Sequence, residues 1–569
     1  MVRYASGSRC VDGDRVTTPQ QGQRTYAERD AVDFVIVGSG AAGGVLAKEL
    51  ATVGFNVVVM EQGPWRQPSE FTHDELAIEQ RHDWLNIATE PYQTFRTTEA
   101  DAPRRNTGLN LRYMRGVGGS TVHFAANYWR FRPSDFKERS IFGSIPGAGL
   151  ADWPITYEEL EPYYTKVDWE IGVSGAPGPF DPPRSRPYPM PPLPIKSSGV
   201  LLERAANRLG LHAQPAPFAI NSELRDGRSA CMACGRCANY GCEFGAKSST
   251  LVTVIPKAIA TGKCEVRTDC TVFRVDTDKN GRATGVVYWD GEGRERRQKA
   301  RATILAANGA ETTRLLLVST SPQFPHGLAN SSGNVGRYLM FNCYESTFGR
   351  FEHPVNEYKG AVAGRIILDF YEHDAKRGFY GGGGIDARFP YNPIGFALSI
   401  LPKDIPSWGS DYKRALRDYY THTVRFTGHL TSVPQRANSI TLDSEHKDSR
   451  GRPSLCLTYE DHADDRTTQH WFQAKTRALM EAAGANKIWD QPIAPSDGSV
   501  QLLGTARMGN DPRDSVVDRY HRAHDVPNLF VCDGSSLVTS GRGNPTMTIQ
   551  ALAFRAAEHI AQFARSHAI

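Results

Sequence analysis

The feature that most constrains this chain is a glycine-rich turn between a short apolar strand and a helix. Residues 32–37, VDFVIV, are followed by Gly38-Ser39-Gly40-Ala41-Ala42-Gly43 and then by a segment with helical spacing. Glycines at positions 38 and 40 let main-chain N–H groups approach a pyrophosphate, and Gly43 lets the helix pack closely against the strand. The N-terminus of that helix then faces the negative charge. The pattern predicts a dinucleotide-binding unit.

The next apolar strand ends at Glu61, 23 residues after Gly38. An acidic side chain at this place in a dinucleotide-binding unit accepts hydrogen bonds from ribose hydroxyls. We therefore predict that Glu61 binds the cofactor. These two features do not distinguish FAD from NAD.

The rest of the chain indicates several folding units, because 569 residues exceed the usual size of one domain. Strand, turn and helix signals return at residues 299–319 and 528–564, and a proline-rich connection covers 176–195. We predict an α/β fold in which the cofactor domain is assembled from separated segments. The predicted parts are a polar N-terminal extension (1–30), the cofactor domain (31–150, 231–340 and 500–569), and the substrate-binding domain with its linkers (151–230 and 341–499).

Composition excludes two classes of partner. The net charge is +4 and no run of Lys or Arg alternates with aromatic residues, which argues against nucleic acid. No stretch approaches the roughly 18 apolar residues of a membrane helix, and residues 1–30 lack an apolar signal core. We expect a cytoplasmic protein without direct membrane insertion, and a periplasmic or membrane-associated one only where a partner subunit carries it there.

A second glycine-rich segment distinguishes FAD from NAD. It is RGVGGSTVHF at 115–124, with Asn127 after it. Together with CDGSS at 532–536 and GNPT at 543–546, it resembles the glucose–methanol–choline (GMC) oxidoreductases. The resemblance implies an FAD-binding Rossmann-like domain, a substrate domain with a mostly antiparallel sheet, and a C-terminal Asn-Pro segment that covers the flavin. Within the family, the chain looks most similar to the flavoprotein subunits of gluconate and fructose dehydrogenases.

The resemblance also assigns residues to the cofactor. It implies that Gly118, Gly119 and Ser120 lie along the flavin, that Asp533 and Gly534 approach the pyrophosphate and ribityl chain, and that Val272 touches adenine. His123 matches the histidine that pyranose oxidases can link covalently to the flavin; the alternative is a histidine packed beside the ring. The full set of implied FAD contacts is Gly38, Gly40, Ala41, Gly43, Glu61, Arg115, Gly118, Gly119, Ser120, His123, Val272, Asp533, Gly534, Asn544, Pro545 and Thr546.

Four of the 10 cysteines lie close together, as Cys231, Cys234, Cys237 and Cys242. Thiolates at such spacing can converge on one centre, and soft sulfur ligands select zinc or iron–sulfur clusters. The similar dehydrogenase subunits carry a [3Fe-4S] cluster here, which passes electrons to a cytochrome subunit and implies a small subunit as a further partner. The spacing differs from that of the fructose enzyme, so zinc, free thiols and a disulfide stay open.

The expected proton acceptor is missing. GMC enzymes place a histidine three residues before the segment that reads Gly504-Thr505-Ala506-Arg507-Met508 here, paired with a second histidine or asparagine. This chain has Gln501 at the first position and Asn544 at the second. Glutamine cannot take up a proton near neutral pH. His123 is the better substitute, because His521 and His524 lie in the polar segment DRYHRAHDVPN, which is typical of a solvated loop.

Three alternative functions are compatible with these sequence features. The first is a dehydrogenase that oxidises a CH–OH group of a sugar, polyol or glycoside and passes electrons to an external acceptor. The second is an oxidase that makes hydrogen peroxide. The third is a flavoprotein with lyase-type or impaired chemistry, which Gln501 supports.

Overall fold

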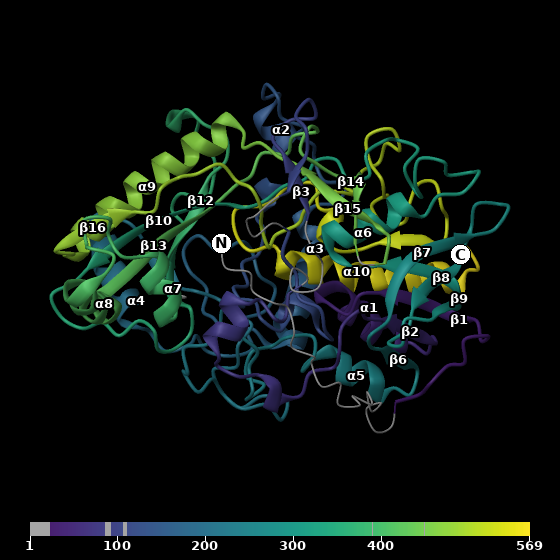
Figure 1. Ribbon diagram of the computed structural model, residues 1–569, viewed down its shortest axis with the longest axis horizontal. Coiled ribbons are helices and arrows are strands. Elements are labelled where there is room, and N and C mark those ends of the chain that lie inside the picture. The colour runs from purple at the N-terminus through teal and green to yellow at the C-terminus, as the bar shows by residue number, and fades with distance from the viewer. Residues whose placement is uncertain (1–22, 86–92, 106–110, 390, 449) are drawn as a thin grey trace, which may run out of the picture.

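The computed structural model describes residues 23–85, 93–105, 111–389, 391–448 and 450–569. These residues form two lobes, each built around one large β-sheet (Figure 1). In one lobe, α1 (Ala41–Thr52) lies against a mainly parallel sheet and α10 (Thr546–Arg565) packs on α1. In the other lobe, α9 (Ala463–Ala483) crosses an antiparallel sheet. The predicted pairing of a Rossmann-like unit with an antiparallel-sheet unit is confirmed.

The first sheet joins segments far apart in the sequence, in the order β6-β2-β1-β9-β8-β7 with β17 also on β9. β2, β1, β9 and β17 are parallel, and Val37 pairs with both Met60 and Leu305, which in turn pairs with Val531. The carboxyl ends of these four strands therefore meet at one edge. The strands are β1 (Val32–Val37), β2 (Val57–Met60), β6 (Cys264–Arg267), β7 (Thr271–Thr277), β8 (Ala283–Trp289), β9 (Glu295–Leu305) and β17 (Leu529–Val531).

The second sheet has two chemically different faces. On one face, Glu345, Ile385 and Phe426 point toward α9 and α4 (Ser197–Arg208), where apolar side chains form a separate core. The opposite face carries polar and aromatic side chains. The strands, in the order β16-β10-β13-β12-β11-β5, are β5 (Ala213–Pro215), β10 (Cys343–Arg350), β11 (Ala363–Ile367), β12 (Gly383–Arg388), β13 (Thr423–Leu430) and β16 (Lys487–Asp490).

A third, smaller sheet lies between the lobes and takes strands from both of the predicted domains. Its strands are β3 (Thr94–Arg96), β4 (Arg104–Arg105), β14 (Ser439–Lys447) and β15 (Pro453–Thr458). The other α-helices are α2 (Glu138–Phe142), α3 (Tyr157–Val167), α5 (Val254–Ala260), α6 (Asn308–Val318), α7 (Pro393–Ser399) and α8 (Gly409–His422). Short 3₁₀ or π turns are η1 (Pro68–Glu70), η2 (Leu76–Gln80), η4 (Gly119–Thr121), η5 (Pro133–Phe136), η6 (Asp168–Gly172), η7 (Ala375–Arg377) and η8 (Gly534–Ser536).

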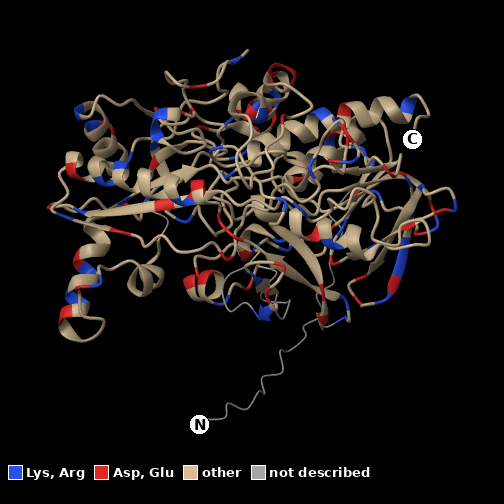
Figure 2. Cartoon of the chain, turned by 90° about the horizontal axis from the view of Figure 1, so that it is seen from above, with Lys and Arg blue, Asp and Glu red and all other residues tan. Residues whose placement is uncertain are grey.

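Charged side chains of both signs are distributed over the part of the chain that the structure describes. Figure 2 shows Lys and Arg interspersed with Asp and Glu along the described chain. Within that part of the chain, no helix combines the length and the apolar character that crossing a bilayer requires.

Candidate flavin and alcohol site

The glycine turn is packed so closely that side chains would not fit. Gly38 has a φ of +96°, and a Cβ on Gly43 would lie 1.9 Å from the carbonyl oxygen of Gly38. The turn ends in Gly40, the N-cap of α1, whose first N–H groups have no partner inside the helix. This arrangement offers main-chain donors and a helix N-terminus to an anion, as the motif predicts.

The carboxylate of Glu61 holds this turn against the second glycine segment. It accepts hydrogen bonds from Ser39 N (3.2 Å), Ser39 Oγ (2.6 Å), Gly63 N (3.0 Å) and Gly116 N (3.3 Å). Burial raises the pKa of Glu61, and these hydrogen bonds lower it in part. Glu61 thus has a structural role at the edge of the sheet where the carboxyl ends of β1, β2, β9 and β17 meet. Its contact with ribose stays a prediction.

The second glycine segment touches the first directly. Gly118 has a φ of +94°, and a Cβ on Gly119 would lie 2.9 Å from Cα of Gly40. Gly118 N donates to Ser39 Oγ at 3.1 Å, and Ser120 Oγ accepts from Met114 N at 3.1 Å. The structure therefore brings together residues that are about eighty positions apart, which the sequence pattern alone could not place. Arg115 is the first residue of this segment, and its main chain lies against Gly63.

Asp533 and Gly534 follow β17 at the same edge of the sheet. Asp533 Oδ2 accepts from Asn308 N (3.0 Å) and Thr312 Oγ1 (2.6 Å), which fixes the carboxylate beside the N-terminus of α6. A Cβ on Gly534 would lie 2.7 Å from the carbonyl oxygen of Leu502, so the segment of Gln501 runs directly past η8. Val272, near the start of β7, comes two residues after Cys270, whose N–H donates to the Glu61 carbonyl (2.9 Å).

Gln501 and Asn544 lie side by side. Nε2 of Gln501 lies 3.4 Å from Oδ1 of Asn544. Asn544 and Pro545 immediately precede α10, which begins at Thr546, and the neighbouring Arg542 is fully buried in an ion pair with Asp135 at 2.8 Å. The loop that carries Asn544 is thereby anchored on both sides.

Several buried polar atoms near this pair have no hydrogen-bond partner among the described residues. Native proteins rarely leave such atoms unsatisfied. They lie on two segments that touch, since a Cβ on Gly543 would be 2.4 Å from the ring of Trp129 and Tyr128 donates to Gln550 at 2.8 Å. This donor and acceptor set suits a polar ring system such as a flavin. The atoms are His123 Nε2, Asn127 Nδ2 and Oδ1, Trp129 Nε1, Asn544 Nδ2 and Gln550 Nε2.

The cysteine loop contacts the same region. Asn239 N donates to the carbonyl oxygen of His123 at 2.7 Å, and the buried Lys247 donates to the carbonyls of Phe124, Cys237 and Tyr240. The four cysteines form no disulfide within the described residues, and they line a small cavity together with Lys247. Burial lowers the pKa of Lys247 to about 8, although nearby sulfurs raise it.

The geometry of this loop bears on its ligand. The described residues contain one group of at least three Cys, His, Asp or Glu side chains whose donor atoms all lie within 4.8 Å of one another. This group is Cys343, Asp461 and Asp465, and it includes none of the four loop cysteines. The cysteine loop is therefore more open than a tetrahedral zinc site, in which Zn–S bonds of about 2.3 Å bring the sulfurs close together.

One sequence expectation is wrong. His521 is fully buried, not solvated, because its segment folds back on β17: Val531 N donates to the His521 carbonyl at 2.9 Å. Burial lowers the pKa of His521 to about 3. His524 is half-buried and lies 2.9 Å from Ser515 Oγ.

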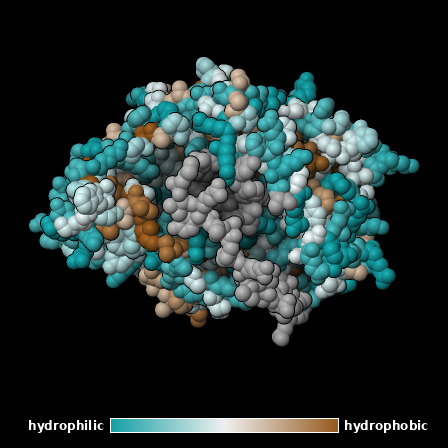
Figure 3. Space-filling view, viewed as in Figure 1, coloured by the Kyte–Doolittle hydropathy of each residue, from teal (hydrophilic) through white to brown (hydrophobic). Residues whose placement is uncertain are grey.

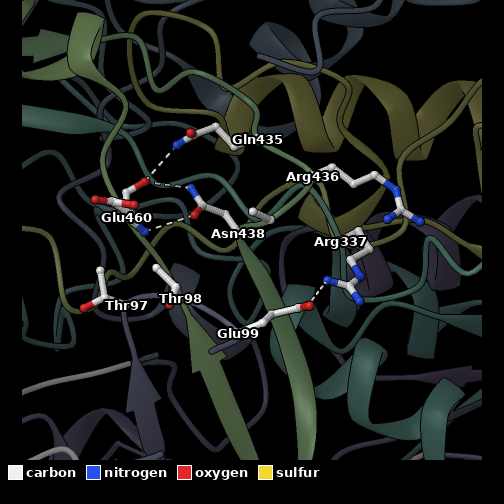
Figure 4. A pocket seen from close by; sticks show the side chains of 9 residues that line it. Thr97, Thr98, Glu99, Arg337, Gln435, Arg436, Asn438 and Glu460 are labelled. Carbon is white, nitrogen blue, oxygen red and sulfur yellow. Dashed lines mark hydrogen bonds and ion pairs between the residues drawn. The ribbon is translucent and has the colours of Figure 1, made fainter. Parts of the chain in front are cut away.

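A separate surface pocket of about 360 Å³ contains none of the predicted site residues. Figure 4 shows that its polar side chains mostly satisfy one another: Arg337 pairs with Glu99, and Gln435 and Asn438 bind the main chain of Glu460.

Sequence reasoning missed the residues that the second sheet brings to the Gln501–Asn544 pair. Tyr344 of β10 donates to Gln501 Oε1 at 2.9 Å, and the His429 ring of β13 lies 5.2 Å from the Tyr344 ring. The signal was present as polar residues, Asp386 and His429, within strand-like segments. Only the register between strands places them side by side.

Comparison with known proteins defines the family. Sequence profiles of the GMC oxidoreductases match residues 32–341 and 434–553, and the chain belongs to this family. It is 35% identical to the 2-methyl-1,2-propanediol dehydrogenase of Mycolicibacterium austroafricanum, over 94% of this chain and 96% of that protein. It is 31% identical to the gluconate 2-dehydrogenase flavoprotein of Pantoea cypripedii (96% and 97% covered) and 29% identical to the fructose dehydrogenase large subunit of Gluconobacter japonicus (93% and 98%).

The fold agrees with this assignment. A formate oxidase variant of Aspergillus oryzae, studied for FAD modification, superposes with a TM-score of 0.62 at 15% identity and covers 95% of this chain and 99% of its own. The predicted fold, oxidoreductase class and resemblance to gluconate and fructose dehydrogenase subunits are confirmed. Membership of the GMC oxidoreductase family supports FAD as the cofactor.

Proposed function

We propose that this protein is an FAD-dependent dehydrogenase that oxidises a CH–OH group of a diol, polyol or sugar. The observation that carries the proposal is the Gln501–Asn544 pair beside the unsatisfied polar atoms of the 123–129 segment. The names of the three relatives, a diol dehydrogenase and two dehydrogenases of sugar-type substrates, support the same substrate class and favour a dehydrogenase over an oxidase.

The residues of the pair bind and orient the alcohol. Because Oε1 of Gln501 accepts from Tyr344 and Nε2 faces Asn544, the amide group of Asn544 keeps its Nδ2 donor for a substrate oxygen. A hydrogen bond to that oxygen fixes the carbon and its hydrogen in one direction, which is a positioning effect. When bound, FAD supplies the acceptor for the hydride that leaves this carbon.

We further propose that electrons leave through an iron–sulfur cluster held by Cys231, Cys234, Cys237 and Cys242. The direct hydrogen bond from Asn239 to His123 connects the loop with the flavin side of the site. The buried ammonium group of Lys247 offsets negative charge on thiolate ligands. When bound, a cluster supplies one-electron steps to an acceptor outside the protein. Iron analysis and electron paramagnetic resonance test this; zinc or iron-free thiols contradict it.

A partner subunit is the proposed acceptor or carrier. Exposed apolar side chains lie at the cysteine loop and on the neighbouring helices, as Met232, Phe244, Leu398 and Trp408. Figure 3 shows brown, apolar surface on the lobe of the antiparallel sheet, near the place of α7 in Figure 1. Such surface is typical of contacts between proteins. The cellular location of the protein would follow from that partner.

His123 has two proposed arrangements with the flavin, a covalent bond or packing beside the ring. Its Nε2 is buried and meets no hydrogen-bond partner in the described chain, and burial lowers the pKa of the ring to about 3. The neutral imidazole is compatible with both. Acid precipitation separates them, because covalent flavin stays in the protein pellet and bound flavin leaves with the supernatant.

The main test measures turnover of diols, polyols and sugars with an artificial electron acceptor and with oxygen. The proposal predicts acceptor-dependent turnover and little hydrogen peroxide. Peroxide at the rate of substrate loss indicates an oxidase instead, and substrate conversion without flavin reduction indicates lyase-type chemistry.

A further inference from the structure

Alcohol oxidation releases a proton, and neither member of the Gln501–Asn544 pair can accept it near neutral pH. In the part of the chain that the structure describes, a histidine held by a carboxylate lies one side chain away from Gln501, through Tyr344. It is His429 on β13, at a position that the sequence motifs do not single out. The inference that follows rests on the proposed alcohol oxidation.

His429 is held by a carboxylate on one side and free on the other. Nε2 lies 3.0 Å from Oδ2 of Asp386, while Nδ1 is buried and lacks a hydrogen-bond partner within the described part of the chain. Both side chains are fully buried. This is the arrangement of a histidine base whose tautomer is fixed by a carboxylate: Nε2–H donates a hydrogen bond to Asp386, and the lone pair on Nδ1 is available.

Asp386 is in turn held as a carboxylate. Arg388 donates to it from Nε at 2.7 and 2.9 Å and also from Nη2. Burial would raise the pKa of Asp386, but the charge of Arg388 and the hydrogen bonds from Arg388 and His429 lower it well below its usual range. The carboxylate therefore stays ionised and stabilises a proton on the imidazole.

The sheet directs His429 toward the Gln501–Asn544 pair. Gly384 on β12 and Tyr344 on β10 both pair with His429 across the sheet, so these residues share the face opposite α9. Tyr344 reaches Gln501, as described above. Trp129 is the second link. The centroid of its ring lies 4.9 Å from that of the His429 ring, and a Cβ added to Gly543 would lie 2.4 Å from the Trp129 ring. Tyr344 thus links His429 to Gln501, and Trp129 links it to the residue before Asn544.

We propose that His429 is the catalytic base of this enzyme, with Asp386 and Arg388 as positioning residues. The O–H bond of the substrate breaks and its proton goes to Nδ1 of His429. The C–H bond breaks with both electrons, which leave as hydride to FAD, and the carbonyl double bond forms. The substrate loses two hydrogens, one as a proton and one as a hydride, so the atoms and electrons balance.

The charges around His429 set the pH dependence. Burial lowers the pKa of His429, Asp386 raises it, and Arg388 and Arg425 lower it, with a net value below the usual one. The phenol of Tyr344 is a further titratable group on this face, and burial raises its pKa to about 12, so it stays neutral. The free base is therefore the form present at neutral pH, and flavin reduction should slow only as the pH falls below about 6.5.

The experiment compares flavin reduction by a diol or polyol in single-turnover mixing of four holoproteins. These are the wild type, His429→Gln, the double variant His429→Gln/Gln501→His, and the control His212→Gln. The control removes an exposed His–Asp pair, in which His212 Nδ1 lies 2.8 Å from Asp369. We expect His429→Gln to reduce its flavin about 10²–10⁴ times more slowly and to lose the acidic limb of the pH profile. The double variant, which places a histidine where GMC enzymes carry it, should recover part of the rate.

Equal rates in the wild type and His429→Gln overturn the proposal while the proposed function stands. A wild-type flavin that no alcohol reduces overturns the proposed function itself. A readout independent of turnover is the ¹⁵N NMR spectrum of wild-type protein with labelled histidine, in which His429 is assigned by comparison with Asp386→Asn. We expect a proton on Nε2 and none on Nδ1 at pH 8; a proton on Nδ1 contradicts the proposal, whatever the rates of the variants.

Discussion

The Tyr344 hydroxyl donates a hydrogen bond to Oε1 of Gln501 at 2.9 Å, and this bond decides which amide atom of the glutamine faces Asn544. With Oε1 occupied, Nε2 is directed to Oδ1 of Asn544, and Nδ2 of Asn544 is left as a donor. A residue of the antiparallel sheet therefore orients two side chains of the C-terminal cofactor segments. The proposed alcohol site therefore depends on contact between the two lobes.

Removal of this phenol should weaken catalysis without loss of FAD. In Tyr344→Phe, one buried hydrogen bond worth about 0.5–1.5 kcal/mol disappears. We expect kcat/KM to fall by roughly 3- to 10-fold, measured in steady state with an artificial acceptor. Tyr412→Phe is the control, since Tyr412 donates to Ala397 between α7 and α8, away from the pair. An unchanged kcat/KM in Tyr344→Phe would show that the orientation of Gln501 does not matter.

The glycine turn makes a sharper prediction about FAD itself. In Gly43→Ala, the new methyl group would lie 1.9 Å from a main-chain oxygen of Gly38, so the helix must move away from the turn. We expect purified protein with little or no flavin, measured by absorbance after gel filtration. Gly291→Ala is the matched control, because its Cβ would lie 3.5 Å from Asp269 in ordinary contact. Full FAD content in Gly43→Ala contradicts the proposal that the glycine turn binds FAD.

The cysteine loop can be tested apart from the flavin. Cys237→Ser should lower the iron content and slow electron transfer to an external acceptor, while reduction of the flavin by substrate continues. Cys456→Ala, in the buried strand β15, is the control for loss of an ordinary core cysteine. Iron that is absent from the wild type and acceptor rates that do not change would rule out the cluster.

A buried carboxyl group on the α9 side of the second sheet predicts a pH effect on stability. Burial raises the pKa of Glu345 to about 8, although hydrogen bonds from Thr476 and Gly428 lower it in part. The folded protein then binds more protons than the unfolded chain between about pH 4.5 and 8, so stability falls as the pH rises through this range. One proton corresponds to at most about 1.4 kcal/mol of unfolding free energy per pH unit.

Thermal unfolding of wild type and Glu345→Gln between pH 5 and 8 measures this effect. Glutamine matches the protonated carboxyl in shape, so the Tm of Glu345→Gln should depend less on pH than that of the wild type. Parallel pH curves for the two proteins would show that Glu345 ionises normally.

The cofactor edge could be predicted from the sequence because its chemistry is local. Gly38, Gly40 and Gly43 act within one strand–turn–helix unit, and the spacing to Glu61 follows from the same unit. The pairing of Gln501 with Asn544 came from the family resemblance, and the structure places the two side chains together. The prediction that His521 lies in a solvated loop failed because a polar segment can still be covered by the strand that follows it.

The base could not be predicted in the same way. His429, Asp386 and Tyr344 belong to three strands, and their contact depends on antiparallel register and on which face meets Trp129. A one-residue slip would turn each side chain to the α9 side of the sheet. No spacing rule within the chain carries that information.

The central claim is that a flavin held at this edge accepts hydride from an alcohol. Anaerobic addition of a vicinal diol or polyol to the purified holoprotein tests it most directly. The account predicts that the yellow absorbance of oxidised flavin disappears and returns when an electron acceptor is added. Protein that is purified without flavin and cannot retain added FAD, or bound flavin that stays oxidised with every alcohol tried, contradicts it.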